Sequence, residues 1–236
     1  MALYVIGDTH LSLGAEKPMD VFGGNWEGYT EKLRRGFSVL GEGDTIVLAG
    51  DISWGMRLTE ALPDFRFLSE YPGRKILVKG NHDYWWDTLS KMNAFFAESG
   101  LDDFEILHNN CFLYKDIALC GTRGWFYEED RGSNAELTHD RRIFLRELGR
   151  LEASLKAAES INPREIYAFL HYPPVFRDFY CAEIIDLFAK YGVSRCFYGH
   201  IHGETQRWAF EGTYGAVTYS LIAADRLGFV PRLIER

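Results

Sequence analysis

Four short apolar runs in this chain end in the same way, with a glycine followed by a polar residue that can bind a metal ion. Each run has the length of a buried β-strand and is rich in aliphatic and aromatic residues. The glycine and the polar residue that close the four runs are Gly7-Asp8, Gly50-Asp51, Gly80-Asn81 and Gly199-His200. The chain is therefore constrained to a fold in which several strands deliver polar side chains to one place.

The first half of the chain alternates between strand and helix patterns. Strands are expected at residues 2–7, 45–49 and 75–79, and helical patterns follow them near residues 27–40, 57–70 and 84–98. This order predicts parallel strands that are joined by crossover helices.

The second half opens with three short apolar runs, FEIL, FLYK and IALCGT, which suggest a meander or a hairpin. We then expect a long amphipathic helix near 134–160, a strand at 165–170, a helix at 181–190 and a strand at 195–198. The runs AVTYSLI and FVPRLIE predict two more strands. The expected total is eight to ten strands and four or five helices, which fits an α/β fold of two sheets packed face to face with helices outside.

The chain of 236 residues contains no repeat, low-complexity tract or Pro/Ser-rich linker, so we expect a single domain over residues 1–236. Its apolar runs are too short to cross a membrane, and its first residues carry no secretory pattern, which favours a cytoplasmic protein. The four cysteines form no CxxC pair and are expected to be reduced and mostly buried.

The net charge of -8 argues against long nucleic acid as a partner. A small anionic substrate remains compatible with this charge, because bound metal ions reverse the sign of the local field. The sequence carries no signal for an oligomeric state.

Seven side chains near strand ends form the candidate metal site, since open α/β sheets place their sites just past the carboxyl ends of their strands. They are Asp8, His10, Asp51, Asn81, His171, His200 and His202. Seven ligands are too many for one transition-metal ion and suit two divalent ions that share one carboxylate. Nitrogen and oxygen ligands without a thiolate indicate Mn, Fe, Zn or Co, and we favour Mn.

Each of these fragments is a weak signal alone, because a lone histidine at a strand end is more often a hydrogen-bonded structural residue. Their order along the chain is more specific. Asp8-x-His10, Gly50-Asp51, Gly80-Asn81-His82-Asp83, His171 and Gly199-His200-x-His202 together resemble the calcineurin-like metallophosphoesterase superfamily. The fragments GDISWG, GNHDYWW and KPMDVFG also resemble a small bacterial branch of predicted phosphohydrolases.

The resemblance implies a four-layer α/β/β/α sandwich of two mixed sheets flanked by helices. It also implies that Asp51 bridges two metal ions. Of the other ligands, Asp8, His10 and His202 would hold one ion, and Asn81, His171 and His200 the other. His82 would bind no metal and would act as the proton donor or as a ligand of the scissile phosphate.

One motif departs from the protein Ser/Thr phosphatases of this superfamily. Those enzymes carry GDxxDRG, in which the second Asp orients the catalytic His and the Arg binds phosphate. This chain has GDISWGM, so that Asp and that Arg are both missing. A protein-phosphatase assignment is therefore disfavoured.

The resulting hypothesis is a dinuclear-metal-dependent phosphohydrolase that cleaves a phosphoester by attack of a metal-bridging hydroxide. We favour a phosphodiesterase acting on a small phosphorylated substrate, with a phosphomonoesterase or a pyrophosphohydrolase as the alternative. Non-catalytic readings are a scaffold on the same fold, or a protein that stores or senses metal. Such scaffolds typically lose ligand residues, whereas this chain keeps every one.

Two further features have open interpretations. Arg123, in the Gly-flanked loop CGTRGW, binds a substrate phosphate in one reading and pairs with Glu128, Glu129 or Asp130 in the other. Trp85 and Trp86, expected at the start of a helix, either wall the site or pack into the core, and we favour the core.

Overall fold

The structure is a computed structural model that describes residues 1–125 and 134–236, without the side chains of residues 134–138. Its first sheet has the strand order β13-β1-β2-β3-β4. The four strands β1 to β4 run parallel, and β13 pairs antiparallel with β1. The strands are β1 (Leu3–Ile6), β2 (Thr45–Ala49), β3 (Arg74–Val78), β4 (Phe104–Ile106) and β13 (Arg232–Glu235).

The second sheet has the order β11-β12-β10-β7-β6-β5 and is also mixed. Its four central strands run parallel, and β11 and β5 pair antiparallel at the two edges. The strands are β5 (Cys111–Tyr114), β6 (Ile117–Thr122), β7 (Glu165–Leu170), β10 (Val193–Tyr198), β11 (Gly212–Tyr214) and β12 (Val217–Leu221). A short hairpin of β8 (Val175–Phe176) and β9 (Phe179–Tyr180) stands apart from both sheets.

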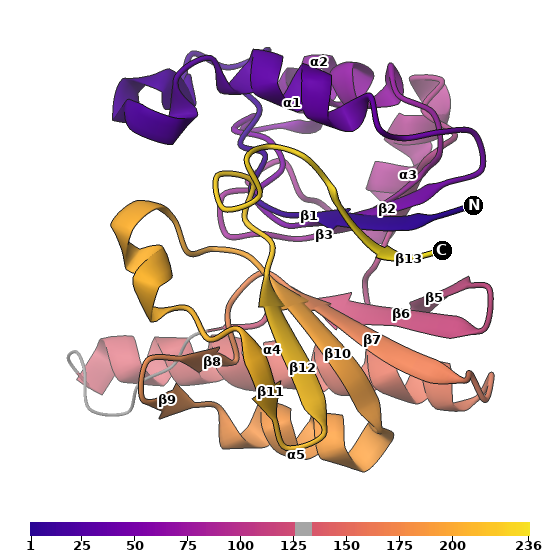
Figure 1. Cartoon of the computed structure of the whole chain (residues 1–236), viewed down its shortest axis with the longest axis vertical. Coiled ribbons are helices and arrows are strands. Elements are labelled where there is room, and N and C mark those ends of the chain that lie inside the picture. Colours follow the sequence, from indigo (N-terminus) through magenta and orange to yellow (C-terminus); the bar gives the residue numbers. More distant parts are fainter. Residues whose placement is uncertain (126–133) are drawn as a thin grey trace.

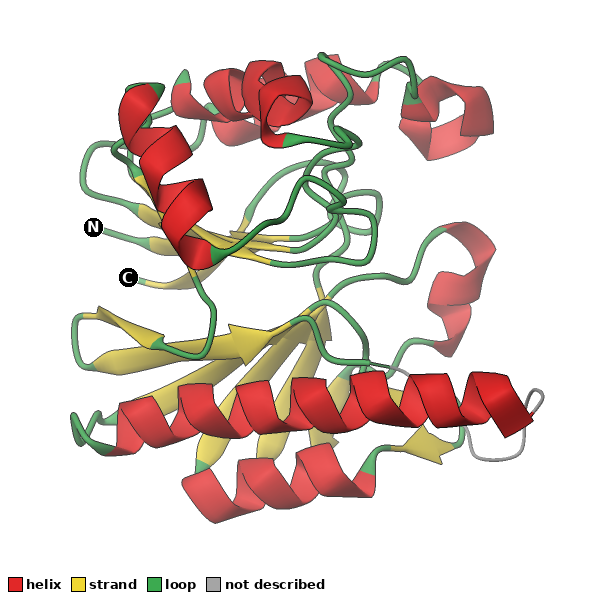
Figure 2. Cartoon of the chain, turned by 180° about the vertical axis from the view of Figure 1, so that it is seen from behind, coloured by secondary structure: helices red, strands yellow, loops and turns green. Residues whose placement is uncertain are grey.

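Helices cover the outer face of each sheet, so the four layers follow one another as helix, sheet, sheet and helix (Figures 1 and 2). The first sheet is covered by α1 (Tyr29–Phe37), α2 (Leu58–Ser69) and α3 (Leu89–Glu98), and the second by α4 (Asn134–Glu159) and α5 (Ala182–Tyr191). Short 3-10 turns are η1 (Met19–Phe22), η2 (Gly24–Trp26) and η3 (Gly203–Trp208). The predicted four-layer sandwich of two mixed sheets is confirmed.

Both faces of the central strands are apolar, because each sheet packs on the other sheet and on its own helices. In β2, Val47 and Ala49 face the second sheet, whereas Ile46 and Leu48 pack toward the helices. Strand β7 divides its residues in the same way, with Phe169 between the sheets. This burial on two faces explains why the runs read as continuous apolar stretches rather than as alternating patterns.

The structure corrects two expectations about the elements. The third helix begins at Leu89 rather than near 84, because the side chain of Asp83 accepts the indole N–H of Trp85 and a turn forms before the helix. The described residues also form thirteen strands rather than eight to ten. The additional strands are short pairs such as β8 and β9, whose two residues each give no periodic signal.

The four cysteines are free, and all except Cys111 are buried. Trp85 lies in the core between the first sheet and its helices, with Trp86 packed against it. Within residues 1–125 and 134–236, every helix is too short or too polar to cross a bilayer.

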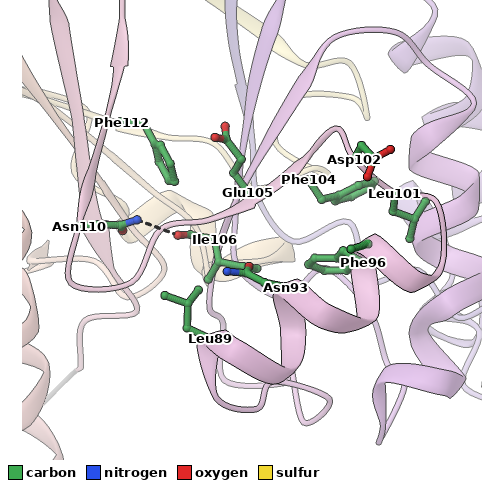
Figure 3. A pocket seen from close by; sticks show the side chains of 11 residues that line it. Leu89, Asn93, Phe96, Leu101, Asp102, Phe104, Glu105, Ile106, Asn110 and Phe112 are labelled. Atoms are coloured by element: carbon green, nitrogen blue, oxygen red, sulfur yellow. Dashed lines mark hydrogen bonds between the residues drawn. The ribbon is translucent and has the colours of Figure 1, made fainter.

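An open pocket of about 380 Å³ lies between α3, β4 and the start of β5 (Figure 3). Phe96, Phe104 and Phe112 line it, and the side-chain amide of Asn110 closes one end by donating to the carbonyl of Ile106 over 3.2 Å. None of the seven candidate metal ligands contributes to this pocket.

Candidate metal centre

Strands from both sheets deliver the candidate ligands to one place. Asp8, Asp51 and Asn81 follow β1, β2 and β3 of the first sheet, and His171 and His200 follow β7 and β10 of the second. Backbone hydrogen bonds hold the loops together, because Asp8 N–H donates to Gly50 O over 2.8 Å and His10 N–H donates to Asp51 O over 2.9 Å.

The ligand atoms gather into two groups. The first is Asp8, His10 and His202, and the second is Asp51, His171 and His200; within each group the ligand atoms all lie within 4.8 Å of one another. Oδ2 of Asp51 is 3.7 Å from Nε2 of His10 and 3.5 Å from Nε2 of His171. The Asp51 carboxylate therefore lies between the two groups.

Asn81 belongs beside the second group. Its Oδ1 lies 2.6 Å from Nε2 of His171, which in turn lies 3.2 Å from Nδ1 of His200. The structure thus brings all seven predicted ligands together, although they are spread over nearly two hundred residues of sequence. The position of Asn81 beside His171 and His200 extends the second group to four residues, Asp51 included.

Four of the candidate ligands have a backbone conformation with positive φ, which residues other than glycine rarely adopt. The φ angles are 58° for Asp8, 45° for His10, 49° for Asp51 and 71° for His200. Each such residue costs on the order of 1–3 kcal/mol, and strain of this kind concentrates at functional sites. The chain therefore bends sharply at the points where these side chains leave their strands.

Two of the glycines that precede ligands are required by close approach. A Cβ atom on Gly80 would lie 2.1 Å from Oδ1 of Asp51, and one on Gly199 would lie 2.3 Å from Oδ2 of Asp8. Both carboxylates also accept backbone N–H groups, Asp51 from His82 over 2.8 Å and Asp8 from His200 over 3.0 Å. The glycines thus let the loops close around the two carboxylates.

Two buried carboxylates that sequence reasoning did not select support the ligand loops. Asp83 accepts the backbone N–H of Ile52 over 2.8 Å and that of Gly80 over 2.7 Å, which ties the β2 and β3 loops together. Asp225 lies 3.0 Å from Nδ1 of His202. Asp83 could have been found from the sequence, because it belongs to the GNHD fragment that also contains a candidate ligand. Asp225 follows two alanines in AADRLG, a context that gives no indication of a role at the site.

Burial shifts the pKa values of the carboxylates upward and those of three imidazoles downward. Both shifts favour the neutral form of the group. It raises the pKa of Asp8, and it raises that of Asp51 further, with the charges of Asp83 and Asp8 adding to the effect. Burial and neighbouring imidazoles lower the pKa of His10 and His171 well below the usual value. Neutral imidazole is the form that binds a metal ion.

The two histidines of the GHIH fragment, His200 and His202, have pKa values shifted in opposite directions. Burial, followed by the charges of nearby histidines, lowers the pKa of His200 to about 4. Burial also acts to lower the pKa of His202, but the carboxylates of Asp8 and Asp225 outweigh it and raise the value to about 10. In the absence of a metal ion, Asp8 and Asp225 therefore favour the protonated form of the His202 ring.

The residues fit divalent metal ions. Nδ1 of His10, Nδ1 of His171 and Nε2 of His202 are buried ring nitrogens without a hydrogen-bond partner among the described residues. Two carboxylates are buried beside them, and charges taken out of water need a counter-charge. Cations at the two groups would supply that counter-charge, and one at the first group would also engage Nε2 of His202, which faces Asp8.

His82 lies beside the centre without joining either ligand group. Trp54 packs on its ring with centroids 4.5 Å apart, and also stacks on His10 at 5.0 Å. Nδ1 of His82 is buried and has no hydrogen-bond partner in the described part of the chain. Trp54 occupies the sequence position at which GDxxDRG places its orienting Asp, so an aromatic contact stands where a carboxylate would be.

Arg123 contacts a residue that was not among its expected partners. Its Nη2 lies 3.3 Å from Oε1 of Glu147, and its guanidinium stacks on Trp125 at 4.7 Å. The acids first considered as its partners, Glu128, Glu129 and Asp130, lie outside the described residues.

Comparison with known proteins gives one family. The sequence profile described as calcineurin-like phosphoesterase matches residues 1–204. No curated protein matches the chain significantly.

Solved structures share the fold at low sequence identity. The phosphopantetheinyl hydrolase PptH from Mycobacterium tuberculosis is 14% identical, with 99% of this chain and 95% of that chain covered and a TM-score of 0.63. TT1561 of Thermus thermophilus is 13% identical, with 99% and 97% covered and a TM-score of 0.54. AQ665 from Aquifex aeolicus, a protein of unknown function, is 16% identical, with 98% and 95% covered and a TM-score of 0.51.

Proposed function

The chain belongs to the calcineurin-like phosphoesterase family, and on that premise we propose that it is a phosphodiesterase that uses two divalent metal ions to hydrolyse a small substrate. The observation that carries the proposal is the position of Asp51, whose Oδ2 lies 3.7 Å from His10 in one ligand group and 3.5 Å from His171 in the other. One carboxylate between two such groups can be shared by a pair of metal ions, which supports a two-metal site.

In this proposal the first group, Asp8, His10 and His202, holds one ion, and the second, Asn81, His171 and His200, holds the other. Manganese is the favoured metal, with iron and zinc as the alternatives that the same ligands accept. When bound, the two ions supply Lewis-acid activation of the phosphoryl group and of the attacking water.

His82 acts on the substrate rather than on a metal ion. Its ring lies 5.8 Å from that of His10, which places it at the edge of the first ligand group. Burial, followed by the charge of His202, lowers the pKa of His82 below its usual value, which favours the neutral ring, and a neutral imidazole still has one N–H to donate. We assign to it donation of a proton, or of a hydrogen bond, to an oxygen of the scissile phosphate.

A diester is favoured over a monoester as the substrate, because the motif position that supplies a phosphate-binding Arg in GDxxDRG has no Arg in this chain. A monoester dianion carries one more negative charge than a diester, and a guanidinium commonly balances it. Gly55 stands where GDxxDRG has its phosphate-binding Arg, so this chain lacks that guanidinium at the motif position.

The test is metal analysis of the purified protein together with hydrolysis of an aryl phosphodiester and an aryl phosphomonoester in the presence of Mn²⁺. We expect about two metal ions per chain, faster hydrolysis of the diester, and loss of turnover in Asp51→Asn because the shared carboxylate is gone. The control is Asp186→Asn, which changes an exposed acid on α5 and should retain turnover.

Each other outcome favours a named alternative. Faster hydrolysis of the monoester would favour the phosphomonoesterase. Cleavage of a pyrophosphate bond alone would favour the pyrophosphohydrolase. A protein that holds no metal and hydrolyses neither ester would favour a non-catalytic scaffold on this fold.

A further inference from the structure

A cluster of cations surrounds one buried carboxylate beside the metal centre. Glu147 in α4 is only 2% exposed, and its Oε1 lies 2.7 Å from Arg150, 3.3 Å from Arg123 and 3.9 Å from Arg146. The hydroxyl of Thr122, the last residue of β6, donates to its Oε2 over 2.7 Å. One carboxylate therefore faces three guanidinium groups.

Lys79 adds a fourth positive charge to this cluster. It follows β3, two residues before Asn81, and is half-buried. It lies close enough to Arg123, Glu147 and Arg150 for their charges to act on it, and within the described residues no carboxylate forms an ion pair with it. Among the described residues of this cluster, four cations against one carboxylate leave a surplus of three positive charges, in a chain whose net charge is -8.

The cationic cluster adjoins the second ligand group. The carbonyl of Arg123 accepts the backbone N–H groups of His171 over 3.1 Å and of Tyr172 over 2.9 Å. The ring of Tyr172 lies 4.2 Å from that of His200 and 5.1 Å from that of Trp125, on which the Arg123 guanidinium stacks. One aromatic side chain thus separates the metal ligands from the cations.

The cluster also has N–H donors without a partner in the part of the chain that the structure describes. A guanidinium has five N–H donors, and the contacts with Glu147 occupy few of them. Nε of Arg123 is buried and has no hydrogen-bond partner among the described residues. A buried donor without a partner is costly, and phosphate oxygens match guanidinium geometry closely.

We propose that this cluster, through Lys79, Arg123 and Arg150, binds a second phosphoryl group of the substrate while the first is cleaved at the metal centre. The substrate class is then a small molecule with two phosphoryl groups, joined as a pyrophosphate or carried separately. The inference rests on the proposed function, because it places the second group beside the metal centre at which the first one reacts. Glu147 holds the guanidinium groups in place and limits their mutual repulsion.

The experiment compares inorganic phosphate with inorganic pyrophosphate as competitive inhibitors of aryl phosphodiester hydrolysis by the metal-loaded protein. Lys79→Met is the first test variant, since no ion pair in the described residues depends on Lys79, and Arg150→Gln is the second. Arg66→Gln, at an exposed position on α2, is the matched control. We expect pyrophosphate to bind wild type and control at least roughly tenfold more tightly than phosphate, with that ratio falling roughly tenfold in each test variant.

An unchanged ratio in both test variants would overturn the inference, and so would equal affinities for the two probes in the wild type. Chelation of metal by pyrophosphate acts on all four proteins alike, so it cannot produce a difference between control and test variants. If the wild type hydrolyses no phosphoester, the proposed function fails instead. Calorimetric titration of pyrophosphate into wild type and Lys79→Met then tests the cluster independently, and equal affinities there would overturn it.

Discussion

Oδ1 of Asp225 lies 3.0 Å from Nδ1 of His202, and its Oδ2 accepts the backbone N–H of Gly203 over 3.0 Å. The carboxylate thereby fixes both the ring and the loop that carries it. With Nδ1 turned toward Asp225, Nε2 of His202 faces Oδ1 of Asp8 at 3.4 Å. A carboxylate behind a histidine in this way selects the tautomer whose other nitrogen is free to bind a metal ion.

Asp225→Ala is therefore expected to weaken binding of one of the two metal ions roughly 10- to 100-fold, while the other ion is retained. Metal titration of the metal-free protein, followed by mass spectrometry of the bound metals, measures this. Asp225→Asn should recover part of the affinity, because its amide oxygen still accepts from Nδ1. Unchanged affinity for both ions in Asp225→Ala would show that Asp225 has no role in positioning His202.

His82→Ala should lower turnover of an aryl phosphodiester roughly 10²- to 10⁴-fold, the usual contribution of a general acid, with metal content unchanged. The metal ions should stay because Asp51 accepts the backbone N–H of His82, over 2.8 Å, and alanine keeps that donor. His139→Ala, at an exposed position on α4, is the control. Wild-type turnover in His82→Ala would remove His82 from the mechanism.

Trp54 is expected to position His82, because its ring packs on that of His82 at 4.5 Å. Trp54→Ala should lower kcat roughly 10- to 100-fold with a much smaller change in KM, because a displaced ring misaligns the proton donor rather than weakening substrate binding. Trp54→Phe keeps an aromatic face and should retain most of the turnover. Metal content must be measured in parallel, since Trp54 also stacks on His10; a loss of metal in both variants would instead assign Trp54 to the ligand group.

The sequence predicted the fold well where local pattern and burial agree. The runs that became β1, β2, β3, β7 and β10 are apolar on both faces, and a strand packed between a sheet and helices requires that composition. Prediction was wrong at the start of α3, where the Asp83 side chain holds Trp85 in a turn. That interaction depends on the β2 loop, because Asp83 also accepts the backbone N–H of Ile52, 31 residues away in sequence.

Most of the candidate ligands could be predicted from a local pattern as well. A glycine followed by Asp, Asn or His recurs in this chain at the ends of apolar runs that form strands. Asp225 was missed because its partner His202 lies on a different loop and no strand-end glycine precedes it. The absence of an Asp at position 54 was evident from the sequence. The packing of Trp54 on His82 was not, because it depends on how the β2 and β3 loops are brought together.

Asp64 in α2 is a buried carboxylate that supports the β2 loop, since the hydroxyl of Ser53 donates to its Oδ2 over 2.5 Å and the N–H of Leu13 to its Oδ1 over 2.7 Å. Burial raises the pKa of Asp64 from 3.8 to about 6, with these hydrogen bonds opposing the shift. The folded state therefore holds this proton more tightly than the unfolded state does. The stability that Asp64 contributes is full below pH 4 and is lost as the pH rises through 6.

Asp64→Asn should remove this dependence, because the amide stays neutral and still has an acceptor for Leu13 and a donor for Ser53. The free energy of unfolding of the variant, relative to wild type, should accordingly increase between pH 4 and pH 7 by on the order of 2–3 kcal/mol. Urea unfolding of both metal-free proteins at several pH values measures the difference, and comparison of the two cancels every other titrating group. A difference that stays constant over this range would show that Asp64 is ionised in the folded protein throughout and that its hydrogen bonds outweigh its burial.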